Sequence, residues 1–349
     1  MEKTNKKKTR VIMEEYGIPN AFEFANLLHL QEDWTIDKFK ENFKIKIVKQ
    51  SEDMYELEFD LIECSAALAN AFRRILLSEV PSMAIEKVYM LNNTSIIQDE
   101  VLAHRLGLLP LKADPRLFEY PSLPSKTSSG EDEVSDQDTL RYEIKVTCKW
   151  NPQAPKDSRR PDDIYCGNNV YSRDIKWVPI GRQAELYPNG EKQLGMIYDN
   201  ILLCKMRPNQ EIHAFMHAVK GIGKDHAKFS PVATASYRLL PDIQIMEPIT
   251  GKAAEKFRDC FSPGVIELVK NGKGEVEAKV KNARYDSCSR NVFHHDELKK
   301  CVKLGRIPDH FIFNVESVGT LPSSVLFLES IKVLKDKCKT FIEELNSIL

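Results

Sequence analysis

Hydrophobic and polar residues alternate along two neighbouring segments in the first part of the chain. Phe43, Ile45 and Ile47 alternate with lysines, and after a polar turn at residues 50–53 apolar and acidic side chains alternate from Tyr55 to Leu61. A period of two places every second side chain on the same face of a β-strand. The pattern therefore predicts a two-stranded ribbon with one buried face.

Two helical patterns follow this ribbon. Ser65 is a suitable N-cap for a helix over residues 66–79, which Pro81 would end. A shorter helix is predicted over residues 98–106, just before Gly107. The first of these helices carries four apolar residues on one face, namely Leu68, Phe72, Ile75 and Leu76.

The middle of the chain is predicted to be mostly β-structure. Apolar or aromatic residues recur at every second position over residues 142–150 and 213–219. Further strands are predicted within residues 229–245 and around residues 311–315.

Two polar segments are expected to be loops. Residues 123–139 are mostly small or acidic, and residues 151–163 are polar with three prolines. Strands and helices do not alternate regularly along the chain, so the pattern indicates the α+β class rather than α/β.

Apolar residues recur at heptad spacing through the last predicted helix, which begins after Pro322 at Ser323 or Ser324. The residues spaced alternately by four and three are Phe327, Ile331, Leu334, Cys338, Phe341, Leu345 and Ile348. Leaving them in water would forgo on the order of 10–20 kcal/mol, so another surface must cover them. The protein's own sheet or a separate subunit could do so. The length of the helix, about 40 Å, favours a partner helix.

The composition argues against several classes of protein. The 349 residues include 50 basic and 51 acidic side chains, a balance that disfavours autonomous nucleic-acid binding. The eight cysteines are scattered, so free thiols in a reducing compartment are expected. Neither a membrane span nor a secretion signal is predicted. The basic residues 6–10 fit either a nuclear-localisation patch or a solvated tail.

Candidate catalytic and metal-binding residues are few. Cys288 and Cys301 flank His294 and His295, but nothing around them resembles a nucleophile motif or a zinc motif. Residues 221–224 carry two glycines and a lysine without the rest of a phosphate-binding loop, and are interpreted as a turn. We therefore predict no catalytic residue, no metal and no cofactor. A thiol enzyme using Cys301 is the alternative class.

Long blocks of residues resemble the alpha-like subunits of RNA polymerases. Residues 69–81, ANAFRRILLSEVP, are similar to the signature helix of these subunits. The likeness continues through residues 92–111, 221–231 and 314–319, in the order of the family, and covers nearly the whole chain from about Glu41 onward. Ordered blocks of this length are more specific than any short motif in the chain.

Within this family the chain most resembles the larger alpha-like subunit shared by RNA polymerases I and III. The polymerase II counterpart carries a zinc-binding cysteine cluster after the block that ends at Leu111, whereas residues 117–139 contain no cysteine. This departure implies that neither zinc nor the iron–sulfur cluster of some archaeal relatives is bound. Residues 231–241 also resemble the I and III branch. A polymerase II type of subunit that has lost its zinc site is the alternative.

The resemblance implies a discontinuous dimerisation domain, residues 37–85 and 229–349, interrupted by an insert domain at 86–228 and preceded by an N-terminal extension at 1–36. The implied function is non-catalytic assembly. The chain would form a heterodimer with a smaller alpha-like subunit, on which the second-largest polymerase subunit and small zinc-bearing common subunits dock. RNA polymerases I and III, to which the subunit would belong, transcribe ribosomal, 5S ribosomal and transfer RNA genes in the nucleus, including the nucleolus.

The resemblance also implies three sets of contact residues. One dimer interface would be formed by both helices, through Leu68, Phe72, Ile75, Leu76, Phe327, Ile331, Leu334, Cys338, Phe341, Leu345 and Ile348. The second-largest subunit would be contacted by Asn70, Arg73, Arg74, His104 and Arg105. The small subunits would be contacted by Lys224, His226 and Lys228.

Overall fold

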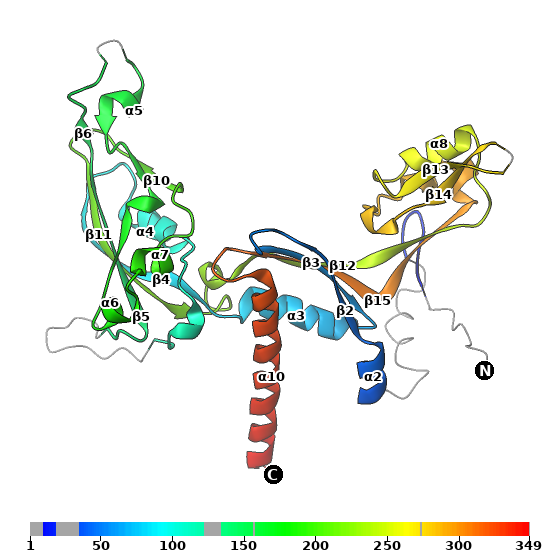
Figure 1. Ribbon diagram of the computed structural model, residues 1–349, viewed down its shortest axis with the longest axis horizontal. Coiled ribbons are helices and arrows are strands. Elements are labelled where there is room, and N and C mark those ends of the chain that lie inside the picture. The colour runs from blue at the N-terminus through cyan, green and yellow to red at the C-terminus, as the bar shows by residue number, and fades with distance from the viewer. Residues whose placement is uncertain (1–9, 19–34, 122–133, 156–157, 273, 349) are drawn as a thin grey trace. The chain divides into compact units, whose positions relative to one another are not determined.

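The computed structural model divides the chain into two compact units (Figure 1). It describes residues 10–18, 35–121, 134–155, 158–272 and 274–348. Unit 1 comprises residues 1–49, 58–70 and 236–314, and unit 2 comprises residues 50–57, 71–235 and 315–349. Antiparallel strands and helices occur together in the chain, which confirms the α+β class. Residues 1–9 and 122–133, which include most of the basic patch and most of the first polar loop, lie outside the described residues.

A five-stranded sheet runs through most of unit 1. Its strand order is β1 (Val11–Met13), β15 (Val302–Ser317), β3 (Glu56–Ile62) and β2 (Lys44–Gln50), and β12 (Val232–Ile245) also pairs with β15. The short helix α2 (Ile36–Asn42) precedes β2, and Thr35 Oγ1 caps it by accepting from the backbone N–H of Lys38. The strands predicted around residues 43–61, 229–245 and 311–315 are thereby confirmed.

Only one of the first two predicted strands has a buried face. β3 buries Leu57, Phe59 and Leu61, and the ring of Phe59 stacks on that of Phe313 with 5.2 Å between the centroids. In contrast, all seven residues of β2 are exposed. The prediction of a shared buried face is therefore wrong for β2, the last strand of the sheet, because the described residues cover neither of its faces.

A small second layer of unit 1 lies between β12 and β15 in the sequence. It consists of α8 (Lys252–Asp259), β13 (Ile266–Lys270), β14 (Val276–Val280) and α9 (Asp296–Lys299). β13 and β14 form an antiparallel hairpin. Apolar side chains from each of its elements form one core, in which Phe257 and Val265 are fully buried.

Unit 2 is built around a four-stranded antiparallel sheet. The strand order is β4 (Ser82–Asn93), β11 (Glu211–Gly221), β5 (Thr139–Thr147) and β9 (Ile175–Val178). α4 (Asp99–Gly107) packs against this sheet through Leu102 and Leu106, which are fully buried. The fully buried Tyr142 donates its hydroxyl to the carbonyl of Leu194 at 2.5 Å. The mostly β character predicted for the middle of the chain is confirmed.

The remaining short elements of unit 2 surround this sheet. Two two-stranded pairs are formed, β6 (Lys149–Trp150) with β7 (Tyr165–Cys166) and β8 (Asn169–Tyr171) with β10 (Leu202–Lys205). Three helices of four or five residues are α5 (Pro161–Ile164), α6 (Gln183–Leu186) and α7 (Gly190–Leu194).

The helices predicted from periodicity are present. α3 spans Ala66–Ser78, and Ser65 Oγ accepts from the backbone N–H of Leu68 at 3.3 Å, as expected of an N-cap. α10 spans Ser323–Ile348 and begins at a predicted residue. α4 begins and ends one residue later than predicted, within the usual uncertainty of helix ends.

Candidate subunit interface

The first turns of α10 are packed into unit 2. Leu326 and Phe327 are buried, and the ring of Phe327 lies edge-on to that of Phe72 on α3, with 5.2 Å between the centroids. The hydroxyl of Ser323 donates to the carbonyl of Tyr55 at 2.5 Å. The start of α10 is therefore fixed by apolar packing and by a hydrogen bond to the residue that precedes β3.

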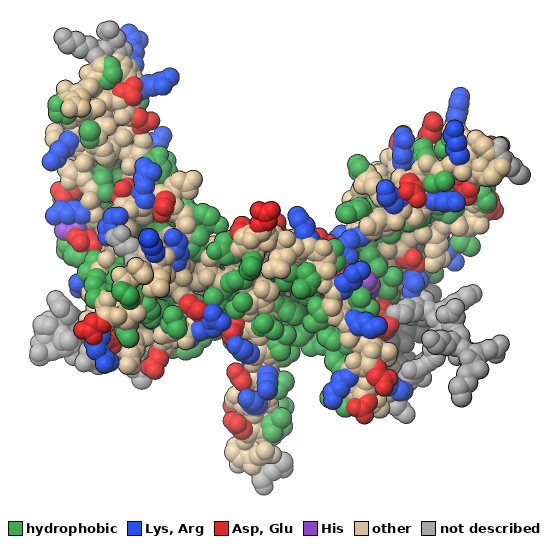
Figure 2. Space-filling model, viewed as in Figure 1, with side chains coloured by type: hydrophobic (Ala, Val, Ile, Leu, Met, Phe, Trp, Pro, Cys, Tyr) green, Lys and Arg blue, Asp and Glu red, His purple; other side chains and the backbone are tan. Residues whose placement is uncertain are grey.

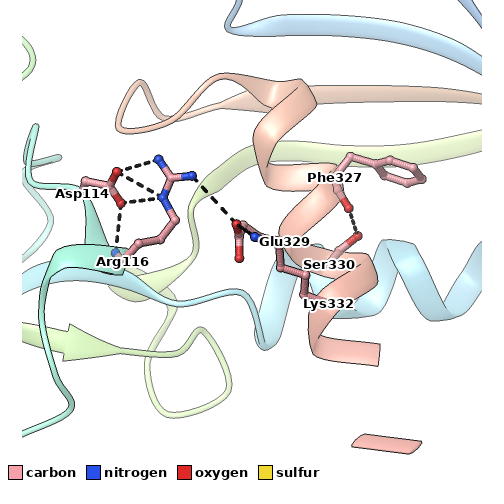
Figure 3. Close-up of polar contacts among 6 residues, drawn as sticks. All are labelled: Asp114, Arg116, Phe327, Glu329, Ser330 and Lys332. Atoms are coloured by element: carbon pink, nitrogen blue, oxygen red, sulfur yellow. Dashed lines mark hydrogen bonds and ion pairs between the residues drawn. The ribbon is translucent and has the colours of Figure 1, made fainter. Parts of the chain in front are cut away.

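Charged side chains hold the next part of α10 against the segment that follows α4 (Figure 3). Arg116 Nη1 lies 3.9 Å from Glu329 Oε1, while its Nη2 is 2.7 Å from Asp114 Oδ2. Lys332 Nζ donates to the same Glu329 oxygen at 2.7 Å. Burial opposes the ionisation of Asp114, but hydrogen bonds from Arg116 outweigh it and hold the pKa of this carboxyl below its usual value.

A second ion pair joins α10 to the end of α3. Lys337 Nζ lies 2.7 Å from Glu79 Oε2 and 2.8 Å from Oε1. Both side chains are partly exposed, so this pair adds about 1 kcal/mol at most. Together with the packing of Phe327, it sets the direction in which the rest of α10 runs.

Beyond this base the apolar face of α10 is open to solvent. Phe341 is 62% exposed, Leu345 45% and Ile348 82%. Figure 2 shows hydrophobic side chains along this part of the helix. We call the following residues the distal stripe: Ile331, Leu334, Cys338, Phe341, Leu345 and Ile348. All are exposed except Leu334, which is half-buried.

The predicted dimer residues thus fall into two groups. Phe72, Ile75, Leu76 and Phe327 are buried within the chain, so they serve the protein's own core. Leu68 is half-buried, and the distal stripe is open to a partner. The family resemblance implied that both groups form one interface, although the chain itself covers the first group.

The three polar residues predicted on α3 lie at or near its surface. Arg74 is exposed, whereas Asn70 and Arg73 are half-buried. The backbone carbonyl of Arg74 accepts a hydrogen bond from Ser78 Oγ at 2.7 Å, within α3.

A pocket of about 260 Å³ in unit 2 brings together residues from two of the predicted sets. His104 of α4 and His226 line it, with 6.1 Å between their ring centroids. Lys228 also lines it, pairs with Glu86 and donates to the carbonyl of Ile85 at 2.8 Å. The pocket therefore carries both imidazoles and charges, and it is open to solvent.

Two other predicted contact residues are partly used within the chain. Arg105 Nη2 donates to the carbonyl of Leu202 in β10 at 2.7 Å. The backbone N–H of Lys224 donates to the carbonyl of Ser78 at 2.8 Å, while the residue itself is exposed. A Cβ on Gly223 would lie 2.3 Å from the carbonyl oxygen of Leu77, so only glycine allows this turn to approach α3 so closely.

The structure does not place Cys301 in one site with His294 and His295, as a thiol enzyme would require. A cavity of about 600 Å³ is lined by His294 and His295, but the cysteine beside them is Cys260. Burial raises the pKa of the Cys260 thiol, which keeps it in the weakly nucleophilic protonated form. Cys301 Sγ instead contacts the carbonyl of Glu297 at 3.3 Å.

No metal centre or membrane span is found in the described residues. No group of three His, Cys, Asp or Glu side chains among them is placed to hold a metal ion. In the same part of the chain, no helix combines the length and the hydropathy needed to cross a membrane.

The interface residues that sequence reasoning missed are those that anchor α10. Arg116, Glu329, Lys337 and Glu79 join segments more than 200 residues apart, and no local pattern marks such pairs. A sequence signal for them would have required knowing which elements are neighbours.

The fold and this helix define the class of protein. The chain belongs to the family of the RNA polymerase Rpb3/Rpb11 dimerisation domain, whose model matches residues 58–338. It is 51% identical over 344 residues to the DNA-directed RNA polymerases I and III subunit RPAC1 of Mus musculus, covering 98% of this chain and 96% of that protein. Identity to the subunit of the same name from Saccharomyces cerevisiae is 47% over 311 residues, or 88% of this chain and 89% of the relative.

Similarity to relatives of other polymerases is lower. The DNA-directed RNA polymerases II, IV and V subunit 3 of Arabidopsis thaliana is 29% identical over 311 residues, covering 84% of this chain and 88% of the relative. The predicted resemblance to the branch shared by polymerases I and III is thereby confirmed.

Proposed function

We propose that this chain is the larger alpha-like subunit of RNA polymerases I and III and that it acts by assembly. The observation that carries this proposal is the distal stripe, an uncovered apolar face on a helix whose base is held by packing and by ion pairs. Burying each large side chain of the stripe against a partner would stabilise a complex by about 1.5–3 kcal/mol. A contiguous exposed face of this kind is typical of an interaction surface.

The occupant of the distal stripe is a helix of the smaller alpha-like subunit. The spacing of four and three residues matches the packing of one helix against another, and the family is named for dimerisation. A helix held at its base presents its stripe in a fixed orientation, so little conformational entropy is lost when the partner binds. The interface is not formed by Phe72, Ile75 and Leu76, which are buried in the core that holds the base of α10.

The other predicted surfaces would then receive the remaining subunits. Arg74 on α3 is an exposed guanidinium suited to a carboxylate of the second-largest subunit. The pocket of His104, His226 and Lys228 offers a concave site to the small zinc-bearing subunits. Asn70, Arg73, Arg105 and Lys224 lie next to these residues in the sequence and would widen the two surfaces.

We retain the proposed domain organisation, with the dimerisation domain at residues 37–85 and 229–349 and the insert domain at 86–228. The insert domain is supported by one core whose buried residues lie between Met83 and Ala218; Met83 and Ile85 of this core belong to the dimerisation domain, and unit 2 also contains residues 315–349. Part of the N-terminal extension, residues 1–36, is used in unit 1, since β1 pairs with β15.

The proposed subunit is not itself an enzyme, and nucleotidyl transfer takes place elsewhere in the complex. The raised pKa of the Cys260 thiol and the scattered arrangement of Cys301 and the histidines support this part of the proposal. The names of the relatives place them in polymerases I and III, so we propose a nuclear and nucleolar location for this chain. Identity of 29% to the polymerase II, IV and V subunit disfavours the polymerase II alternative.

The test is co-purification with the smaller alpha-like subunit. Leu334→Glu and Phe341→Glu should each abolish the heterodimer, because a carboxylate would be buried unpaired. Thr340→Glu is the matched control: it adds the same group on the other side of the helix, where Thr340 is exposed, and should leave the heterodimer intact. Unchanged co-purification of both stripe variants would refute the interface. A wild-type chain that stays a stable monomer beside the smaller subunit would refute the function.

A further inference from the structure

An aromatic pair stands at the end of the hairpin formed by β6 and β7 in unit 2. Trp150 and Tyr165 are directly paired across these two strands, and their rings meet edge to face with 5.0 Å between the centroids. Trp150 is nevertheless 63% exposed. A single exposed apolar residue is common on protein surfaces, but a large ring held in a defined position by a neighbouring ring can serve as an anchor for a partner.

One cation contacts this pair, and two more lie in the segment that joins its two strands. The guanidinium of Arg207 lies over the ring of Tyr165, 5.6 Å from its centroid. Arg159 and Arg160 lie in the connection between the two strands and are exposed, whereas Lys149, the residue before Trp150 in β6, points to the opposite face of the strand. Figure 2 shows several Lys and Arg side chains on this end of the molecule, around α5. We call Trp150, Arg159, Arg160, Tyr165 and Arg207 the hairpin surface.

The acids nearest in the sequence are engaged within the connection itself. Asp162 Oδ1 accepts hydrogen bonds from Asn168 and Asn169, each at 2.7 Å. Asp163 Oδ2 accepts from Ser158 Oγ at 2.6 Å. These contacts hold the connection in shape but leave both carboxylates charged, and the hydrogen bonds from Asn168 and Asn169 hold the pKa of Asp162 below its usual value. The three arginines of the hairpin surface nevertheless outnumber these two acids.

We propose that the hairpin surface binds an acidic peptide segment of another protein. An apolar side chain of that segment packs on Trp150, and its carboxylates pair with the surrounding arginines. Trp, Tyr and Arg are the residues that most often dominate the binding energy of protein interfaces. Arginine also matches carboxylates with paired hydrogen bonds, which gives the contact its specificity for acidic residues.

The arrangement of the rings favours a peptide over single-stranded nucleic acid. Nucleic-acid platforms stack successive bases on several open aromatic faces. Here Trp150 packs against Tyr165, and Arg207 covers a face of Tyr165, so only Trp150 offers an open ring. One anchor within a basic surrounding fits one apolar residue within an acidic segment. No residue of α3 or α10 belongs to this surface, so the proposal does not depend on the heterodimer.

The probe is a fluorescein-labelled peptide of Asp and Glu residues with Phe and Leu at its centre. It is titrated, with anisotropy as readout, into the full-length chain purified with whatever subunit it retains. Trp150→Ala should weaken binding about tenfold, and Arg207→Ala should weaken it several-fold and reduce its salt dependence. Tyr198→Ala is the control, because Tyr198 is an aromatic residue of unit 2 with 47% exposure and lies outside the surface. Its affinity should match the wild type.

Three results would overturn the proposal. The first is an acidic peptide that does not bind, or binds Trp150→Ala as tightly as the wild type. The second is equal binding of the same peptide with Asn and Gln in place of its acids. The third is tighter binding of an oligothymidylate of equal length, which would assign the surface to nucleic acid. Thermal unfolding of each variant checks that it is folded, as expected for substitutions at exposed positions.

Discussion

Arg284 donates hydrogen bonds to both carboxylate oxygens of Asp60, with Nη2 2.6 Å from Oδ1 and Nη1 3.0 Å from Oδ2. Its Nε donates to Glu58 Oε1 at 2.8 Å. Both acids lie on β3, whereas Arg284 follows β14 in the small layer of unit 1. The side chains of Asp60 and Arg284 are only 6% and 11% exposed. A buried charge pair therefore ties that layer to the sheet.

Removing this arginine should loosen the small layer. Arg284→Ala leaves Asp60 buried without its main partner, and the free energy of unfolding should fall by about 3–5 kcal/mol. Arg284→Lys should be intermediate, since a lysine cannot donate to both oxygens of Asp60 and also to Glu58. Urea unfolding measures the loss, and hydrogen exchange over α8 to β14 shows where it occurs.

The matched control for this substitution is Arg258→Ala. Arg258 pairs with the neighbouring Asp259, and the two side chains are 48% and 66% exposed. An exposed pair contributes at most about 1 kcal/mol, so this variant should unfold almost as the wild type does. Equal losses of unfolding free energy in the Arg258 and Arg284 variants would contradict a stabilising role of the buried pair of Arg284 and Asp60.

The same pair should make stability depend on pH in the acid range. Burial opposes the ionisation of Asp60, but hydrogen bonds from Arg284, with His310 Nε2 also 3.0 Å away, hold the pKa of Asp60 below its usual value. A carboxyl whose pKa is lower in the folded state stabilises the fold above its unfolded pKa of about 3.9. That stability is lost as the pH falls through the folded-state pKa.

Urea midpoints recorded from about pH 6 downward test this dependence. The wild type should lose stability progressively below about pH 5. Asp60→Asn, which cannot ionise, should be less stable at neutral pH and should change less over the same range. An Asp60→Asn variant with the full acid dependence of the wild type would assign that dependence to other carboxyls.

Some elements could be predicted from the sequence because their pattern is long and local. α10 extends for 26 residues with a regular apolar period, and α3 has both a cap and a following proline. The small layer of unit 1 was missed because α8 has eight residues and β13 and β14 have five each. Over such lengths a helical and a strand period are hard to distinguish.

The candidate interface was predicted only in part, for a different reason. A heptad pattern shows that an apolar face must be covered, but it does not show what covers it. Phe327 is covered by Phe72, 255 positions earlier in the chain, whereas Phe341, which belongs to the same heptad pattern, is not covered by the described residues. The pattern also predicted the wrong face of β11. The strand was predicted from the alternation of His213, Phe215, His217 and Val219, but the fully buried side chains are those of the opposite face, such as Ala214 and Met216.

Cysteine accessibility reports directly on the distal stripe. Of the eight cysteines, all of which the structure describes, Cys166 and Cys338 are exposed. In the heterodimer Cys338 should be protected from maleimide by the partner helix, while Cys166 on β7 reacts at once. Cys64 should stay unreactive in both states, because burial raises the pKa of its thiol to about 11.

Peptide mapping by mass spectrometry separates these three thiols. Release of the smaller subunit with mild denaturant should raise the labelling rate of Cys338 by at least about tenfold, while that of Cys166 stays constant. A Cys338 that reacts as fast as Cys166 in the intact heterodimer would place the partner away from the stripe.

Arg74→Ala should separate formation of the heterodimer from binding of the second-largest subunit. Arg74 is exposed on α3 and alanine is a good helix former, so the helix and the heterodimer should remain intact. Loss of an interfacial arginine commonly weakens binding by about 2 kcal/mol, or roughly 30-fold. We therefore expect the tagged variant to retain the smaller alpha-like subunit and to lose the second-largest subunit, as quantified by mass spectrometry after affinity purification.

Arg182→Ala, which removes an arginine of unit 2 that is 73% exposed, should retain both. Loss of the smaller subunit from the Arg74 variant would instead place this arginine in the dimer interface, and retention of both subunits would show that it contacts neither.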